Sequence, residues 1–136
     1  MSEILNKIKT ELDIFEAKKK QLVEELRKEF PQMFSKLFNK SKCIESVSWT
    51  QYTPYFNDGE ECVFSANTNW LDLNGEDYYS RDEIEGWDKT EEAIIQEIKN
   101  VLGSIPEDFF RELFGDHAQI TLKKNGDIIV TEYEHD

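Results

Sequence analysis

The stretch that decides the fold is "QITLKKNGDIIVTEYEH", Gln119 to His135, in which apolar and polar residues alternate on both sides of Asn125-Gly126. Alternation with a period of two is typical of a β-strand, and Asn-Gly is a strong signal for a two-residue hairpin turn. Such a turn places Lys124 opposite Asp127 and Leu122 opposite Ile129. The stretch therefore predicts an antiparallel hairpin.

A second hairpin is predicted around "WTQYTPYFNDGEECVF", Trp49 to Phe64. Alternation over 47–52 and again over 62–67 indicates two strands, and "NDG" is turn chemistry. The loop between them would hold about eight residues, with Tyr55 and Phe56 near its tip. We expect Trp49 and Phe64 to pack in the core. Strand character continues to Leu73, and an acidic loop with one helical turn follows over 72–88.

The first third of the chain predicts helices. Residues 3–29 contain no Gly or Pro, and six of their apolar residues fall on a and d positions of one heptad frame; Lys19 and Glu29 occupy the other seam positions, and Ile4, Ile14 and Val23 lie outside the seam. This stripe would either cover the domain's own sheet or pair helices between chains; its members are Leu5, Ile8, Leu12, Phe15, Leu22 and Leu26. Pro31 suits the first turn of a new short helix that ends at 39–42.

Two further helices are predicted between the hairpins. Asp88 and Glu91 have the spacing of a capping box, which indicates a helix over 90–102. Pro106 begins another short helix, and Gly115 ends it. The element order predicts an α+β fold: an antiparallel sheet of about four strands in two hairpins, with the long N-terminal helix and further helices packed on one face. We expect a single domain over 1–136, with a helical part (1–42) and an acidic α+β part (43–136).

Charge is unevenly distributed along the chain. The 136 residues carry 16 Lys and Arg against 29 Asp and Glu, a net charge of −13. Residues 1–42 have a net charge of +3 and residues 43–136 a net charge of −16. The acidic part would repel phosphates, so direct nucleic-acid binding is not expected. Without a membrane-length apolar run or a secretion leader, we expect a cytoplasmic protein that does not bind membranes.

The acidic run between Asp72 and Glu97 holds ten acids and two bases. Carboxylates at this density attract basic surfaces, and aromatic residues often anchor interfaces. We therefore expect a non-enzymatic protein that docks on a basic, nucleic-acid-binding protein as an inhibitor or accessory factor. Its partner surface would consist of Asp77, Glu83, Glu85, Glu91, Glu92, Tyr55, Phe56 and Trp87. Three alternatives stay open: a merely solubilising acidic surface, an assembly protein that forms a homodimer through the N-terminal helix, and a carboxylate enzyme with a divalent metal.

The inventory of reactive side chains argues against catalysis. The two histidines are His117 and His135, and no Cys/His pair has zinc-ligand spacing. The segment "DLNGED" resembles a calcium loop, but its Gly75 stands fourth and not sixth. Cys43 and Cys62 lack CxxC spacing and indicate two reduced thiols. We expect no enzyme, no cofactor and no metal site.

The run "WTQYTPYFNDGEECVF" resembles a segment of small uncharacterised bacteriophage proteins. The acidic composition and small size are also similar to phage inhibitors that imitate DNA, such as anti-restriction and anti-CRISPR proteins. These resemblances imply a phage-encoded inhibitor, and they imply no particular site residues.

Overall fold

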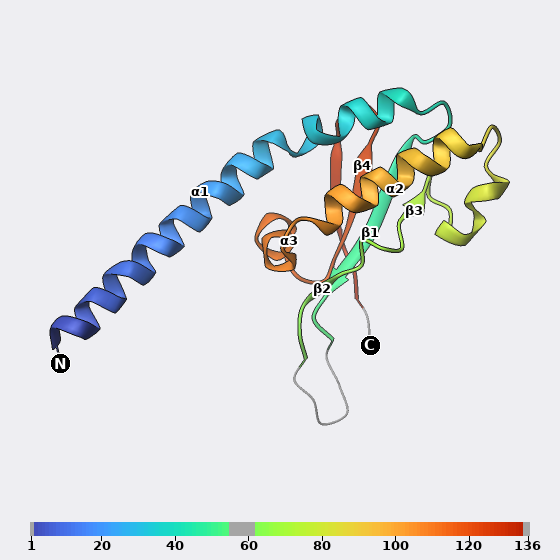
Figure 1. The fold of residues 1–136 in the computed structure, drawn as a ribbon. Helices are drawn as coiled ribbons and strands as arrows, with labels where there is room; N and C mark the ends of the chain where they lie inside the picture. Colours follow the sequence, from blue (N-terminus) through green and yellow to red (C-terminus); the bar gives the residue numbers. More distant parts are fainter. Residues whose placement is uncertain (1, 55–61, 135–136) are drawn as a thin grey trace. The chain divides into compact units, whose positions relative to one another are not determined.

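A computed structural model describes residues 2–54 and 62–134, and it confirms the α+β class (Figure 1). The chain divides into two units, residues 1–30 and residues 31–136; the single domain stays a prediction. The elements in chain order are α1 (Ser2–Lys40), β1 (Ser46–Tyr52), β2 (Ser65–Ala66), β3 (Asp72–Leu73), the 3₁₀-helix η1 (Tyr78–Glu83), α2 (Lys89–Gly103), α3 (Glu107–Phe114), β4 (Ala118–Lys123) and β5 (Ile128–Glu132).

Helix α1 is continuous through Pro31, so the prediction of a separate helix from that residue is wrong. An interior proline removes one backbone hydrogen bond and costs about 3 kcal/mol relative to alanine. Within the second unit, Phe34, Leu37 and Phe38 are buried at helical spacing. Their burial offsets the cost of the proline, because each large apolar side chain contributes about 2 kcal/mol when it leaves water.

The sheet of the second unit is antiparallel, as predicted, and has five strands, in the order β2-β1-β4-β5 with β3 also paired to β1. The central pair is β1 with β4, where Val47 lies opposite Leu122 and Trp49 opposite Ile120. These four side chains are buried. Figure 1 shows α2 crossing in front of β1 and β4. The core therefore lies between one face of the sheet and the helices.

The C-terminal hairpin forms as predicted, but its register differs by one residue. Leu122 lies opposite Ile128 and not Ile129. Lys123 N donates to Asp127 O at 2.9 Å, and Gly126 N donates to Lys123 O at 2.9 Å. Gly126 has φ 96°. The connection is thus a three-residue loop with glycine in the left-handed position, and not the two-residue turn that Asn-Gly indicates.

The first hairpin is shorter than expected. Among the described residues, strands β1 and β2 pair at Gln51 with Ala66 and at Tyr52 with Ser65. Residues 62–64, which the alternation assigned to a strand, lie outside β2. Tyr55 and Phe56 lie outside the described residues.

No described helix combines the length and apolar character that a bilayer crossing demands.

Helices α2 and α3 match their predicted bounds to within a residue or two. Asp88 caps α2, its side chain accepting a hydrogen bond from Glu91 N, and Gly115 ends α3 with φ 91°. Trp49 packs edge-on against Phe110 of α3, with ring centroids 5.7 Å apart. Trp49 is buried as expected, whereas Phe64 is only partly buried.

Candidate functional site

Glu91, one of the five acids expected on the partner surface, lies in the protein interior with 0% of its surface exposed. Its Oε2 accepts a hydrogen bond from Ser41 Oγ at 2.5 Å, and its Oε1 accepts one from Lys42 N at 2.7 Å. The capping-box spacing is present, but this carboxylate reaches across to the segment after α1. The sequence could not reveal this role, because the partners are about fifty residues away. Glu91 therefore holds the fold together and presents no charge to a partner.

The other four acids of the predicted partner surface differ in their exposure to solvent and in their hydrogen bonds within the chain. Glu92 accepts a hydrogen bond from Arg81 Nε at 2.7 Å, and this bond is the main reason why the pKa of Glu92 is lowered. Asp77 caps η1 by accepting from Tyr79 N at 3.1 Å, yet it is exposed. Glu83 and Glu85 are exposed, and the proposed anchor Trp87 is partly buried.

Three aromatic rings gather beside β3: those of Trp70, Tyr78 and Tyr79. The Trp70 and Tyr79 rings lie 5.4 Å apart at an interplanar angle of 34°. Tyr78 contacts both of them edge-on, with centroids 6.0 Å away. Trp70 is 56% exposed and Tyr79 is 68% exposed, whereas Tyr78 is buried. The cluster thus has one fixed ring and two rings that face solvent.

The fixed ring of this cluster already binds two cations of the chain. Arg81 Cζ lies 4.3 Å and Lys99 Nζ 4.7 Å from the Tyr78 ring centroid. Lys99 Nζ also donates to Tyr78 Oη at 3.1 Å, and Gln96 Nε2 does so at 3.2 Å. A cation over a tyrosine face is attracted by about 0.5–2 kcal/mol. These contacts fasten Tyr78 to α2 and position the exposed rings.

Carboxylates flank the rings because of a tight turn after β3. Leu73 and Glu76 exchange two backbone hydrogen bonds of 2.8 Å around Asn74 (φ 54°) and Gly75 (φ 81°). Two positive φ values are typical of a type I′ hairpin turn, the geometry that Asn-Gly favours. The turn brings Asp72 and Asp77 near one another. Burial, and then the charge of Asp77, raise the pKa of Asp72.

Together these residues form one surface, which we call the aromatic–acidic patch: Trp70, Tyr78, Tyr79, Asp72, Glu76 and Asp77. Of the predicted partner residues, only Asp77 belongs to it. The signal that could have found the patch was "NG" at Asn74-Gly75, the same dipeptide that predicted the C-terminal hairpin. Burial is the main cause of the raised pKa of Asp72 and the charge of Asp77 is the second, so a cation docked beside this pair would stabilise the ionised form of Asp72.

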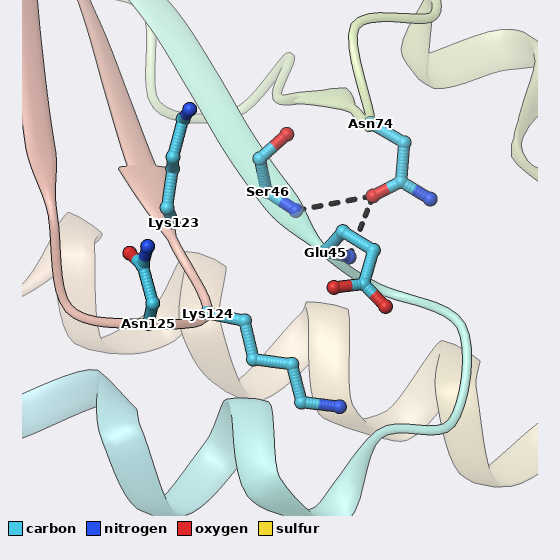
Figure 2. Close-up of a pocket in the computed structure, with 6 residues that line it drawn as sticks. All are labelled: Glu45, Ser46, Asn74, Lys123, Lys124 and Asn125. Carbon is cyan, nitrogen blue, oxygen red and sulfur yellow. Dashed lines mark hydrogen bonds between the residues drawn. The ribbon is translucent and has the colours of Figure 1, made fainter.

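A second candidate is a polar pocket where β1 and β4 meet (Figure 2). Asn74 Oδ1 accepts from Glu45 N at 2.6 Å and from Ser46 N at 3.1 Å, and Asn74 Nδ2 donates to Cys43 O at 2.8 Å. Lys124 Nζ donates to Ser41 O at 3.0 Å. Most polar groups in this pocket are thus occupied in joining loops, so the pocket has a structural role.

Metal and thiol chemistry find little support in the described chain. Over residues 2–54 and 62–134, no group of three His, Cys, Asp or Glu side chains is placed to hold a metal ion. Cys43 and Cys62 are both free thiols. Burial, and then the charge of Glu91, raise the pKa of Cys43, which makes it a poorer nucleophile.

The predicted oligomerisation stripe lies on the α1 helix of the first unit. Five of its members are exposed: Leu5, Ile8, Leu12, Phe15 and Leu22. Leu26 is partly buried.

Comparisons of the chain with protein-family models, with curated proteins and with solved structures find no match.

Proposed function

We propose that this protein is a binding module whose aromatic–acidic patch captures a basic segment of a partner protein. The observation that supports this most is the exposed, tilted pair of Trp70 and Tyr79, which lies close in the chain to the carboxylates Asp72 and Asp77. An arginine or lysine side chain can stack on such rings while its charge meets the carboxylates. Solubility alone requires the carboxylates but does not require exposed rings.

The chain itself provides a precedent for this recognition. Arg81 lies over the Tyr78 ring and donates to Glu92, so one guanidinium is held by an aromatic face and a carboxylate at once. Trp70 and Tyr79 offer a comparable combination on the outside. Basic segments of this kind are common in nucleic-acid-binding proteins. An inhibitory or accessory role on such a protein, encoded by a phage, is the wider form of the proposal.

The test uses fluorescein-labelled nona-arginine as the probe and fluorescence anisotropy as the readout. Asp72→Asn, Glu76→Gln and Asp77→Asn are combined in one variant; asparagine at 77 preserves the cap of η1. The matched control removes three exposed acids elsewhere in the second unit, through Glu45→Gln, Glu97→Gln and Glu132→Gln. Both variants change the net charge equally, so only a localised site distinguishes them.

We expect the patch variant to weaken probe binding about tenfold more than the control, because nearby charges act most strongly on a docked cation. Trp70→Ala combined with Tyr79→Ala should weaken probe binding by a further severalfold. This loss of affinity should persist at 0.5 M salt, where simple charge attraction is screened. Equal losses in the patch and control variants would refute the proposal and leave a solubilising acidic surface.

A further inference from the structure

The first unit exposes an apolar stripe along its helix. Leu5, Ile8, Leu12, Phe15 and Leu22 are between 45% and 66% exposed and occupy a and d positions of one heptad frame, with Lys19 on the seam between Phe15 and Leu22. A shallow apolar groove lies between Ile8, Leu12 and Phe15. We propose that this stripe pairs with the same stripe of a second copy of the chain as an antiparallel two-stranded coiled coil.

The charges beside the stripe identify the occupant. With Leu5 and Leu12 at a positions and Ile8 and Phe15 at d, the flanking e positions are Lys9 and Glu16, and the flanking g positions are Glu11 and Lys18. All four are exposed. Each flank thus carries one cation and one anion at heptad spacing. Such a pattern is self-complementary only when the two helices run in opposite directions.

In the antiparallel register that sets Leu12 opposite Phe15 of the second copy, each of these four charges meets its opposite, and Glu25 at the next g position faces Ile4. Lys9 faces Glu16 of the second copy, and Glu11 faces its Lys18; two-fold symmetry repeats both pairs. Leu5 lies opposite Leu22 of the second copy near each end of the core, and Ile8 lies opposite Lys19, whose aliphatic stem can cover the isoleucine while its ammonium group reaches solvent. The overlap covers residues 2–25, about 36 Å of helix at 1.5 Å per residue.

The competing arrangements are electrostatically poorer. A parallel dimer places Glu11 beside Glu16 of the second copy and sets the two Lys19 side chains face to face. An antiparallel shift of one heptad in one direction opposes Lys9 to Lys9 and Glu11 to Glu11. A shift in the other direction opposes Glu16 to Glu16 and Lys18 to Lys18.

One further register, which overlaps residues 11–30, forms two Lys18–Glu25 pairs. It sets Glu29 opposite the apolar Leu12 of the second copy, and it leaves Leu5 and Ile8 uncovered. It also sets Lys19 opposite Leu22, so it places two charged residues in the seam and forms two charge pairs, whereas the register with Leu12 against Phe15 places one, Lys19, and forms four. The register with Leu12 against Phe15 also explains why the exposed stripe begins as early as Leu5.

Sedimentation equilibrium of the full chain tests the pairing itself. We expect a dimer of about 32 kDa, twice the 16.1 kDa chain. Leu12→Gln with Phe15→Gln should give a monomer that retains the secondary structure of the second unit by circular dichroism. Both residues are exposed in the single chain, so their loss does not remove core packing. A strictly monomeric wild type at 200 μM, about the level at which weak coiled coils assemble, would overturn the proposal.

A charge change distinguishes the orientations. Glu16→Lys faces Lys9 of the second copy in the antiparallel pair and should raise the dimer dissociation constant about tenfold. In a parallel pair the same change faces Glu11 and would strengthen the dimer instead, which would overturn the antiparallel assignment. Adding Lys9→Glu to the same chain should restore wild-type dimerisation. Asp13→Lys, on the outer face of the helix, is the matched control and should leave the dissociation constant unchanged.

A spin-label distance gives an independent test. Glu3→Cys, in a chain carrying Cys43→Ser and Cys62→Ser, provides one labelling site per copy. In the antiparallel register the two labels lie 21 residues apart along the axis, or about 30 Å. A distance near 15 Å between labels would indicate parallel helices and overturn the register. None of these measurements depends on the aromatic–acidic patch.

Discussion

Replacing Glu91 tests the buried contact that joins α2 to the end of α1. The Glu91 carboxylate accepts from Ser41 Oγ and from Lys42 N and is completely buried. Glu91→Gln retains one acceptor oxygen but turns an amide N–H₂ toward the other donor. Because a hydrogen bond to a charged group contributes about 1.5–3 kcal/mol, we expect Glu91→Gln to lower the free energy of unfolding by about 2 kcal/mol. Glu91→Ala leaves both donors unpaired and should cost about 4 kcal/mol.

The measurements are urea unfolding, for the free energy, and thermal unfolding, for the midpoint temperature, both followed by tryptophan fluorescence and by circular dichroism. For a chain of this size, 1 kcal/mol corresponds to about 3–4 °C in the unfolding midpoint, so Glu91→Gln should lower the midpoint by about 7 °C. Glu97→Gln is the matched control, because Glu97 lies on the same helix and is exposed. A change at Glu91 as small as that at Glu97, within about 0.5 kcal/mol, would refute the buried contact.

A double-mutant cycle isolates the Glu91–Ser41 pair. Ser41 Oγ donates to Glu91 and also accepts from Ile44 N at 2.8 Å and Cys43 N at 3.3 Å. Ser41→Ala therefore removes the hydrogen bond that the hydroxyl donates to Glu91 and the two that it accepts from backbone N–H groups. We expect a coupling energy of at least about 1 kcal/mol between Ser41→Ala and Glu91→Gln, since both belong to one hydrogen-bonded network. Additive effects would mean that the two side chains do not interact.

Two further predictions concern pH and the turn. Asp116 is desolvated by burial, yet hydrogen bonds from Thr53 N and Thr53 Oγ1 (both 2.7 Å) lower the pKa of Asp116 below its ordinary 3.8. A lowered folded-state pKa contributes stability that is present above about pH 4 and is lost as the pH falls through the folded-state pKa. Asp116→Asn should therefore make the loss of stability at acid pH less steep in a plot of unfolding free energy against pH. An unchanged slope at acid pH would contradict this. Gly126→Ala should lower the free energy of unfolding by about 1–2 kcal/mol, because Gly126 has φ 96°, which strains any residue with a Cβ. No atom lies within 4 Å of the added Cβ, so backbone strain and not a clash would cause the loss. Gly103→Ala is the matched control, since it adds a methyl group equally free of neighbours at ordinary φ and should be neutral or slightly stabilising; equal effects at both positions would contradict the three-residue loop.

Local signals predicted most of the fold. Alternation identified β1, β4 and β5, and the Asp88–Glu91 spacing identified the start of α2. Errors arose where two local rules competed. Pro31 is a helix-start signal, but burial of the apolar residues after it favours continuing the helix. Asn125-Gly126 indicates a two-residue turn, yet the strands pair one residue further out, and only the pairing of β4 with β5 decides between these loops.

The candidate site was predictable only in its charge. Trp70 and Tyr79 are nine residues apart, and the tight turn at Asn74-Gly75 folds the segment between them. No periodicity connects two such rings, so their stacking emerges only from the three-dimensional structure. The predicted anchor Trp87 is partly buried, and Tyr55 and Phe56 lie outside the described residues.

The acidic run illustrates why charge density overstates a binding surface. Within it, Glu91 is buried, Glu92 is paired with Arg81, and Asp88 caps a helix while contacting Lys42 at 3.4 Å. These carboxylates interact with groups of the chain itself, so their potential is already partly satisfied. Asp77 also caps a helix, η1, but it is exposed, and its charge contributes after burial to the raised pKa of Asp72. The proposed capture of a basic segment therefore depends on where the exposed carboxylates lie rather than on the net charge of −13, and the charge-matched control in the binding experiment separates the two.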